Sequence, residues 1–507
     1  MSFSKNTFTN IFGEISSEFN VYTIEDIASD EKRSIISGPF GSNISSKYFT
    51  EHGVPVIRGN NLTEDNTKFI DEGFVFVSEE KAKELNTYAD VDDLVFTAAG
   101  TIGQVGIIPE NSKFDRYVIS NKQLRVTLDL NKVNQHYAYY WFSSKLINKY
   151  IKQLNTGSTI PLINLTILKG LPIPLPSKDL QDKIANIIIN IDKKIEINKK
   201  INKNLEQLMK CIFEDWFVNF NYSNDISFKS SELGEIPSNW NVKKLRDVLI
   251  VLESGKRPKG GISNIDDGIP SIGAENILGL GKFNYSKNKL ISHEFFSTLK
   301  KGVIQDKDVL LYKDGAQLGR KSLFMKGFPF DICCINEHVF RLQSNDEINQ
   351  FYLYLWLDQE VMTNEIINLN SNSAQPGINQ NDVKSLPILV PELKIISKFN
   401  KIISPMMNQI FDNALKINKL TNLRDTLLPK LMSGEIDVSK INCDLKIIIR
   451  KIYIKSSKLF LWRYLSENKN YIKNTKSNET LLKSRTIYKI NKFLAKFTTR
   501  YRYYRQQ

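Results

Sequence analysis

The sequence lacks the motifs that most enzymes and metal-binding proteins carry. Its four cysteines include no CxxC pair, and its four histidines are scattered. HExxH, GxSxG, GxxxxGK[ST] and the Asn/Asp-Pro-Pro-aromatic motif of amino-methyltransferases are all missing. The glycines of "GTIGQVG" and "ESGKRPKGG" match neither a Rossmann fingerprint nor a P-loop. We therefore expect no catalytic residues, no metal and no cofactor in this chain.

Long apolar runs are missing as well. No stretch reaches the roughly 18 uninterrupted apolar residues that a membrane helix needs, and the first 20 residues contain no apolar signal core. The cysteines do not form a disulfide framework, and Cys333 and Cys334 lie in an apolar run that predicts buried structural thiols. These features predict a cytoplasmic protein without a membrane partner.

Positive charge is concentrated at the C-terminal end. The whole chain has 69 Lys and Arg against 55 Asp and Glu, and residues 441–507 account for 17 and 3 of them. Residues 1–440 therefore hold 52 charges of each sign. Net charge alone does not predict nucleic-acid binding by the main body.

An internal repeat organises that body. "GSTIPLINLTILKGLPIPLP" (157–176) and "QPGINQNDVKSLPILVP" (375–391) share Pro, Asn and Leu-Pro positions at an offset of 215 residues. The same offset relates the pairs Pro55 and Pro270, Asn61 and Asn276, Gly100 and Gly315, Asn121 and Asn336, and Trp141 and Trp356. So many dissimilar matches at one offset indicate a tandem duplication.

Each repeat has two parts. The first is a globular region of short alternating apolar runs and Gly/Asn/Asp turns, which predicts strands and loops. The second is a long helix with an apolar residue every three or four positions, which predicts a heptad seam. The seam positions include Ile184, Ile188, Ile191, Ile195, Asn198 and Leu205 in the first repeat and Phe399, Ile403, Met406, Ile410, Asn413 and Leu420 in the second.

One such helix cannot bury its apolar stripe alone, but the two can pair. We predict an α+β fold in which two mixed α/β globules are each followed by a long helix. The helices would pair as an antiparallel coiled coil with pseudo-two-fold symmetry. Asn198 and Asn413 either fix the register of the seam or are exposed, and Pro405 either kinks the second helix or starts a new one.

The order of these features resembles the specificity subunit of Type I restriction-modification systems. The resemblance covers residues 20–438 and includes both proline segments with the helix starts that follow them. It also includes "SGPFGSN" (37–43), "SGKRPKGG" (254–261) and the ending "LRDTLLPKLMSGEIDV" (423–438). It implies target-recognition domains at 1–176 and 221–391, spacer helices at 177–220 and 392–438, and an extension at 439–507.

The resemblance also implies a function and partners. Each domain would read one half of a bipartite sequence in double-stranded DNA, and the helices would set the spacing and dock two methylation subunits. Restriction subunits would complete the nuclease, with S-adenosylmethionine, ATP and Mg²⁺ used by the partner subunits. The chain itself would be a non-catalytic DNA reader. The DNA sequence, its spacer and the presence of restriction activity do not follow from this chain.

Polar and basic side chains in the predicted loops are candidates for the DNA contacts. Cations bind phosphates or guanine edges, and amides can read adenine. The alternatives are a solvated loop for the cations and turn roles for the asparagines. The candidates are Lys32, Arg33, Lys47, Arg58, Asn60, Asn61, Thr101, Gln104, Lys122 and Arg125 in the first domain, and Lys256, Arg257, Lys259, Glu275, Asn276, Lys313, Gln317, Arg320 and Lys321 in the second.

Two rival functions and the tail stay open at this stage. The chain could be a self-contained methyltransferase-nuclease fusion, which the missing motifs oppose, or a coiled-coil adaptor without a DNA role, which the two globular repeats oppose. The basic, aromatic tail at 441–507 is either a nucleic-acid-binding arm or a weakly ordered extension.

Overall fold

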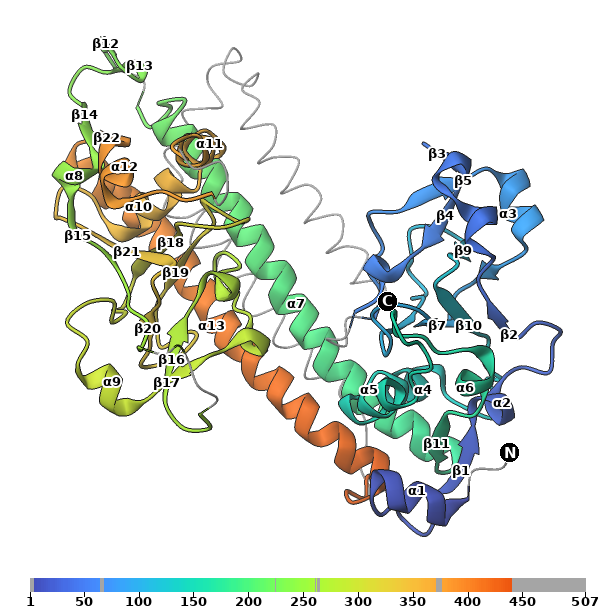
Figure 1. Cartoon of the computed structure of the whole chain (residues 1–507). Helices are drawn as coiled ribbons and strands as arrows, with labels where there is room; N and C mark the ends of the chain where they lie inside the picture. Colours follow the sequence, from blue (N-terminus) through green and yellow to red (C-terminus); the bar gives the residue numbers. More distant parts are fainter. Residues whose placement is uncertain are drawn as a thin grey trace. The chain divides into compact units, whose positions relative to one another are not determined.

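The computed structural model describes residues 4–63, 68–223, 225–259, 261, 265–370 and 376–439. They divide into two compact units, the first holding residues 4–194 and 420–439 and the second residues 195–419 (Figure 1). Each unit contains one globular domain, called domain 1 (up to residue 176) and domain 2 (225–391). The basic tail from residue 440 onward lies outside the described residues.

Domain 1 contains six helices and eleven strands among its described residues. The helices are α1 (Lys5–Phe12), α2 (Ile24–Ile27), α3 (Glu79–Leu85), α4 (Gln135–Phe142), α5 (Lys145–Gln153) and α6 (Leu165–Lys169). The strands are β1 (Asn20–Thr23), β2 (Ile35–Ser37), β3 (Phe49–Thr50), β4 (Val54–Ile57), β5 (Val75–Val77), β6 (Tyr88–Ala89), β7 (Leu94–Thr97), β8 (Val105–Ile107), β9 (Tyr117–Ile119), β10 (Gln123–Val126) and β11 (Pro172–Leu175). They form sheets of order β1-β11, β2-β10-β7-β8 and β3-β5-β4-β9-β6.

Domain 2 repeats this plan with a smaller third sheet. Its helices are α8 (Leu245–Val248), α9 (His293–Ser297), α10 (Gln350–Leu357), α11 (Glu360–Asn368) and α12 (Gln380–Ser385). Its strands are β12 (Phe228–Ser231), β13 (Gly234–Pro237), β14 (Asn241–Lys244), β15 (Leu249–Ser254), β16 (Ile269–Ile272), β17 (Leu290–Ile291), β18 (Asp308–Tyr312), β19 (Lys321–Phe324), β20 (Cys334–Ile335), β21 (Val339–Ser344) and β22 (Pro387–Val390). The sheets β14-β22 and β15-β21-β18-β19 correspond to β1-β11 and β2-β10-β7-β8.

The repeated proline segment supplies β11 and β22, the last strand of each domain. Prolines are tolerated there because each strand pairs on one side only, within a two-stranded sheet. The preceding aromatic helix is bonded to each strand in the same way. Trp141 Nε1 donates to Pro172 O at 2.6 Å, and Trp356 Nε1 donates to Pro387 O at 3.0 Å. The repeat is therefore reproduced down to single hydrogen bonds.

The matching "SG" motifs at the start of each central sheet need glycine for space. A Cβ added to Gly38 would lie 1.8 Å from Ser120 O, and one added to Gly255 would lie 1.7 Å from Ile335 O. No other residue could let these loops leave β2 and β15 so close to the neighbouring strand.

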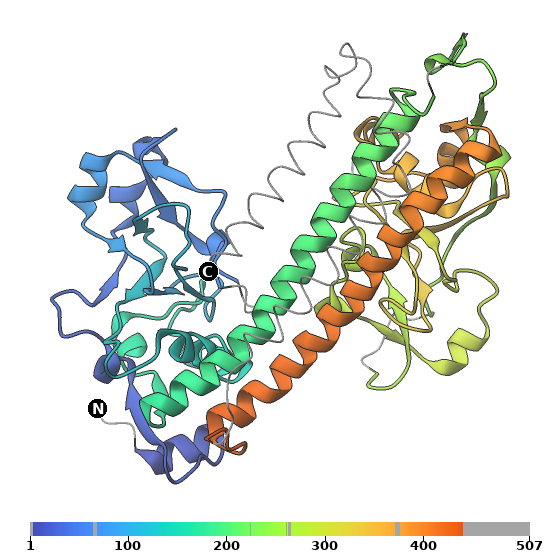
Figure 2. The same cartoon turned by 180° about the vertical axis from the view of Figure 1, so that it is seen from behind.

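The predicted long helices are α7 (Lys178–Phe217) and α13 (Leu393–Ser433), about 60 Å each. In the first unit, Asp192 lies beside Arg424 and Lys183 beside Ser439, so the helices run antiparallel (Figure 2). In the second unit, Asn202 lies beside Asn413 and the Phe213 ring lies 5.9 Å from Phe399, again antiparallel. This confirms the predicted fold class of two tandem domains with long helices that pair antiparallel.

Most of the predicted seam residues are buried. Ile184, Ile188, Phe399, Ile403 and Met406 are almost inaccessible, whereas Asn198 and Leu420 are half-buried. Of the two asparagines singled out in the sequence, Asn413 is in the seam. Its Nδ2 donates to Asn202 Oδ1 at 2.8 Å, and Asn202 Nδ2 donates to Ile410 O at 3.0 Å. A paired amide of this kind fixes the register of two helices.

Pro405 does not start a new helix, because α13 is continuous from Leu393 to Ser433. Proline removes one hydrogen bond to the carbonyl four residues earlier. Here Pro405 and Lys401 both lie on the exposed face. Water can therefore satisfy the carbonyl that has no backbone partner.

The first unit contains a buried polar triad that the second unit replaces with apolar residues. Asp192 Oδ1 lies 3.0 Å from Arg424 Nη1, and its Oδ2 accepts a 2.6 Å bond from Tyr140 Oη. The positions 215 residues away are Met407, Met209 and Leu355, all of them buried. Burial opposes the charge on Arg424, but the Asp192 carboxylate outweighs it and raises the guanidinium pKa.

Cys333 and Cys334 are buried, as the sequence predicts. Burial raises the pKa of the Cys333 thiol to about 12 and that of Cys334 to about 11. Both thiols are therefore protonated and poorly nucleophilic at neutral pH. None of the helices in the described part of the chain combines the length and apolar character that crossing a membrane requires.

Candidate nucleic-acid interface

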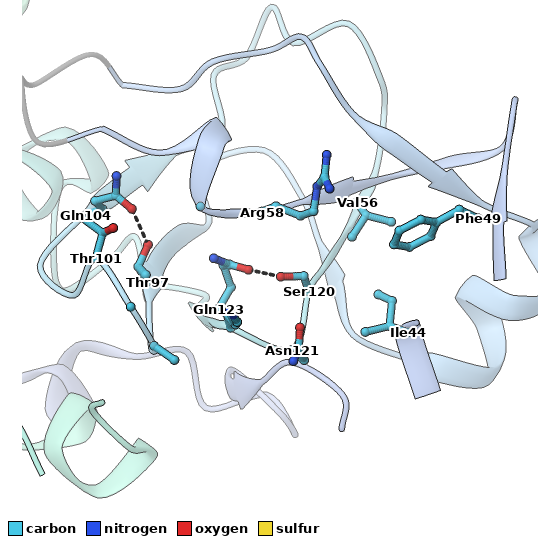
Figure 3. A pocket seen from close by; sticks show the side chains of 14 residues that line it. Ile44, Phe49, Val56, Arg58, Thr97, Thr101, Gln104, Ser120, Asn121 and Gln123 are labelled. Carbon is cyan, nitrogen blue, oxygen red and sulfur yellow. Dashed lines mark hydrogen bonds between the residues drawn. The ribbon is translucent and has the colours of Figure 1, made fainter. Parts of the chain in front are cut away.

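The loops that join the central strands of domain 1 surround an open cavity of about 370 Å³. One side is polar and is formed by the ends of β7 and β10 and the turns between strands. The other side is apolar and comes from β3, β4 and the 3₁₀ helix before them (Figure 3). The lining side chains include four predicted candidates, Arg58, Thr101, Gln104 and Lys122, and also Ile44, Phe49, Val56, Thr97, Ser120, Asn121 and Gln123.

Gln123 is the residue at the centre of this cavity, and the sequence analysis missed it (Figure 3). Its side chain is 0% exposed, and its Oε1 accepts a hydrogen bond from Ser120 Oγ. Its Nε2 has no hydrogen-bond partner among the described residues. The sequence signal was present, since Gln123 closely follows the repeat position Asn121, but a buried glutamine in a strand cannot be distinguished from a core residue by pattern.

Gln104 and Thr97 form the opposite end of the polar side. Thr97 Oγ1 donates to Gln104 Oε1 at 3.0 Å, and Gln104 Nε2 donates to Leu62 O at 3.1 Å. Gln104 is therefore held in place on both sides of its amide. Thr101 is exposed at the adjoining turn, and Arg58 is half-buried at the end of β4.

Asn61 and Asn276 lie where DNA cannot reach them. Asn61 is 0% exposed, with its Oδ1 accepting from Arg58 N and its Nδ2 donating to Ile70 O and Glu72 O. Asn276 is 1% exposed and is bonded in the same way to Gly273 N and Asn284 O. The structure thus gives both residues the turn role that the sequence left as the alternative to base reading.

We predict that Asn61→Ala destabilises the protein without changing what it binds. Removing this amide leaves buried backbone groups at Ile70 and Glu72 unpaired, which costs about 1–3 kcal/mol. Urea unfolding monitored by fluorescence measures the loss. Asn60→Ala is the control, because Asn60 is exposed and its bond to Gly73 O is long, at 3.4 Å. Equal destabilisation by both variants would contradict the assignment.

Three candidate cations are also structural. Lys321 is buried with its Nζ bonded to Thr363 Oγ1 at 2.7 Å, and burial lowers its pKa to about 8. Arg125 pairs with the buried Asp93 at 3.4 Å and extends its guanidinium along the sheet. Arg320 is half-buried and donates to Ile277 O at 3.1 Å and to Gln317. Sequence cannot reveal such burial, because the charge is satisfied by residues far along the chain.

The exposed candidates in domain 1 are distributed around it. Lys122 and Asn60 lie near the cavity rim, and Asn60 contacts Gly73 O. Lys32, Arg33 and Lys47 are also exposed but do not line the cavity. Arg33 donates to Asn86 O at 2.8 Å, and Lys47 lies 4.7 Å from the centre of the Tyr48 ring.

Domain 2 places a charged cluster at the corresponding loops. His338 bonds Asp314 through Nδ1 at 2.6 Å and lies 3.3 Å from Glu337 through Nε2. Arg257 pairs with Glu337 at 2.8 Å, and Lys313 with Asp314 at 3.1 Å. Two candidate cations thus lie in a network with His338, which the sequence suggested only as a surface strand residue.

The remaining candidates of domain 2 are exposed or half-buried. Glu275 forms a 2.7 Å ion pair with Lys289, and Gln317 is exposed beside Arg320. Lys256 and Lys259 are exposed in the loop after Gly255. Among the described residues, no group of three or more His, Cys, Asp or Glu could hold a metal ion.

Strand pairing shows that equivalent positions in the two domains shift by one residue at this site. Ala98 N donates to Lys122 O, and Lys313 N donates to His338 O. Val95 pairs with Arg125, and Leu310 with Arg341. After β9 and β20 the structural offset is therefore 216, so Lys122 corresponds to His338, and Gln123 to Val339. The 215 offset holds again at the aromatic helices.

Comparison with known proteins identifies relatives for the whole arrangement. The family model described as "Type I restriction modification DNA specificity domain" matches residues 16–207 and again residues 237–424. The Type I restriction enzyme MjaIX specificity subunit of Methanocaldococcus jannaschii is 26% identical over 432 residues, which are 85% of this chain and 96% of that protein. The HindI specificity subunit of Haemophilus influenzae is 24% identical over 387 residues, 64% of this chain and 83% of that protein.

A solved structure also resembles the chain. The crystal structure of a Type I restriction-modification system S subunit from M. genitalium covers 82% of this chain and 96% of its own, at 18% identity and a TM-score of 0.48.

Proposed function

Because the chain belongs to the family of Type I restriction modification DNA specificity domains, whose model matches it twice, we propose that it is the DNA-recognition subunit of such a system. The observation that supports this proposal most directly is the duplicated architecture. Two domains of the same topology each present a set of strand-end loops, and the side chains on those loops differ. Two such modules read two different half-sites of one DNA target.

The chemistry of the two loop sets fits base recognition better than catalysis. Domain 1 presents amides, hydroxyls and cations, which are the groups that read base edges and bind phosphates. Domain 2 adds carboxylates, which accept hydrogen bonds from the amino group of cytosine. The chain would supply specificity, and methylation subunits docked on the helices would supply the S-adenosylmethionine chemistry. Restriction subunits using ATP and Mg²⁺ would complete the complex in the cytoplasm.

Genome-wide methylation mapping tests this proposal. A host without its own Type I system expresses the chain together with its neighbouring methylation subunit. We expect one new bipartite motif with a fixed gap, methylated once on each strand. A host carrying the methylation subunit alone is the control and should show no such motif. New methylation at an uninterrupted site would contradict the two-domain assignment.

The loop after Gly255 gives a second prediction about DNA binding. Lys256 and Lys259 are exposed and suited to phosphate contacts. Replacing both by alanine is expected to weaken binding to all sequences alike and to reduce the slope of log K against log salt by about 0.9 for each phosphate that is no longer neutralised. Binding titrations of the complex at several salt concentrations measure this slope. Lys321→Ala is not a valid comparison because that lysine is buried, so Lys419→Ala, on the exposed face of α13, is the control.

A further inference from the structure

We propose that the cavity of domain 1 receives one nucleobase turned out of the DNA helix, so that the two domains read DNA in different ways. The inference rests on the proposed function and extends it. The cavity is lined by Arg58, Gln104, Gln123, Thr97 and the apolar group Ile44, Phe49 and Val56, and it has a volume of about 370 Å³. That volume falls within the range of pockets that hold small molecules.

The shape of the site indicates a ligand that protrudes. A base in a paired duplex presents only its edge, at the floor of a groove, so side chains must reach outward to contact it. A concave protein surface leaves space that such an edge cannot fill. An extruded base does fill a pocket, and pockets of this kind combine hydrogen bonds to the base edge with apolar or aromatic walls.

The two sides of the cavity match the two faces of a base. Phe49, Ile44 and Val56 lie together on one side, where a flat base could pack against them (Figure 3). Gln123 and Gln104 provide the polar side. A phosphate would favour a site dominated by cations, whereas Arg58 and Lys122 are the only cations among the lining residues of this cavity.

A buried donor without an acceptor points to the ligand. Gln123 is 0% exposed and lines the cavity, and its Oε1 is engaged by Ser120, which fixes the orientation of its amide. Its Nε2 has no acceptor in the described part of the chain, and the same is true of Arg58 Nε. Leaving buried donors unpaired is unfavourable. Two unpaired donors therefore select a base with carbonyl oxygens, which guanine, thymine and cytosine have and adenine lacks.

Domain 2 does not carry the same set at the corresponding positions. Val339 replaces Gln123, and Gly273 and Gly319 replace Arg58 and Gln104. Tyr312 stands where domain 1 has Thr97. The His338–Asp314 bond lies in this region instead. We therefore expect the extruded base in the half-site of domain 1 alone.

A mismatch scan of the intact methylation complex tests the proposal. Once the motif is known, each base of both half-sites is kept in turn while its partner is replaced by a mismatched base. Extrusion is easier from a mismatch, so affinity should rise at least tenfold at one position of one half-site. The methylated adenine is scored separately, because methyltransferases extrude their own target base. A 2-aminopurine placed beside the same position should become brighter on binding.

Two variants connect that position to the cavity. Gln123→Glu keeps the size of the side chain but removes the donor, and Gln123→Val introduces the residue that domain 2 has. Both should abolish the tenfold gain while the mismatch at the methylated adenine behaves as in the wild type. Unchanged thermal unfolding of either variant excludes a loss caused by misfolding.

The contrary outcomes are distinct. If a bipartite motif is methylated but no mismatch outside the methylated adenines tightens binding, the inference is wrong and the proposed function stands. If the gain persists in Gln123→Glu, the base is held elsewhere and the inference is also wrong. If guanosine monophosphate binds the chain without DNA and Gln123→Glu abolishes that binding, the cavity is a free-nucleotide site and the inference is overturned.

Discussion

Replacing Arg424 by methionine is expected to destabilise the protein by about 3–5 kcal/mol, because breaking a buried ion pair leaves the other charge without compensation. The side chains of Arg424 and Asp192 are 7% and 8% exposed, so water cannot solvate the carboxylate that remains. Tyr140 Oη would be its main buried partner. The shift in the urea midpoint of the transition that reports on the first unit measures the loss.

The second unit supplies the design of the rescue experiment. At the positions equivalent to Tyr140, Asp192 and Arg424 it uses Leu355, Met407 and Met209. Replacing a buried ion pair by well-packed apolar residues of similar volume is often neutral or stabilising. The triple variant Y140L/D192M/R424M should therefore recover most of the stability that R424M loses.

Comparison of these variants separates two explanations of the effect. If the triad contributes only through its charges, D192M and R424M are both destabilising and the triple variant is close to the wild type. If the triple variant is as unstable as R424M, packing around these positions differs between the units and the repeat does not extend to their interior.

Lengthening both long helices by one heptad is expected to reduce methylation of the wild-type motif more than tenfold. Seven residues added between Lys199 and Lys200, and seven between Leu415 and Lys416, preserve the seam to within about 20°. They lengthen the pair by about 10 Å, the length of about three base pairs. Three base pairs also turn the DNA by about three tenths of a helical turn, so the half-sites no longer face their domains.

Methylation mapping of the lengthened chain gives the result directly. A motif with the wild-type gap and unchanged methylation would show that the helices do not set the distance. Insertion into α7 alone is the matched control, because it shifts one seam against the other and should lower thermal stability. The double insertion should not, since both junctions lie among exposed or half-buried residues.

Much of the fold follows from the sequence because its signals are local or repeated. The proline segments predict the last strand of each domain, since proline restricts the backbone wherever it occurs. The heptad pattern predicts α7 and α13, and the offset of 215 residues predicts that both domains share one topology. Trp141 and Trp356 show how far this extends, because both indole nitrogens bond the same strand position.

The candidate site follows from the sequence only in part. Arg58, Thr101, Gln104 and Lys122 do line one cavity, but Asn61, Asn276 and Lys321 are buried. Burial depends on which distant segments pack over a residue, and no local pattern records that. The one-residue shift between β10 and β21 also escapes a fixed offset, so Gln123 and Val339 are matched only by their hydrogen-bonding ladders.

The end of domain 1 has a consequence for building chimeric proteins. Gln181 Oε1 accepts from Asn134 N at 2.9 Å, its Nε2 donates to Pro176 O at 3.0 Å, and Asn134 Nδ2 donates to Asp182 Oδ1 at 2.8 Å. The first turn of α7 is thus tied to the body of domain 1. A gene fusion that exchanges domain 1 should therefore be joined after Asp182 and not at Pro176, where the proline segment ends. A graft that follows the apparent domain boundary would carry Asn134 away from both of its partners.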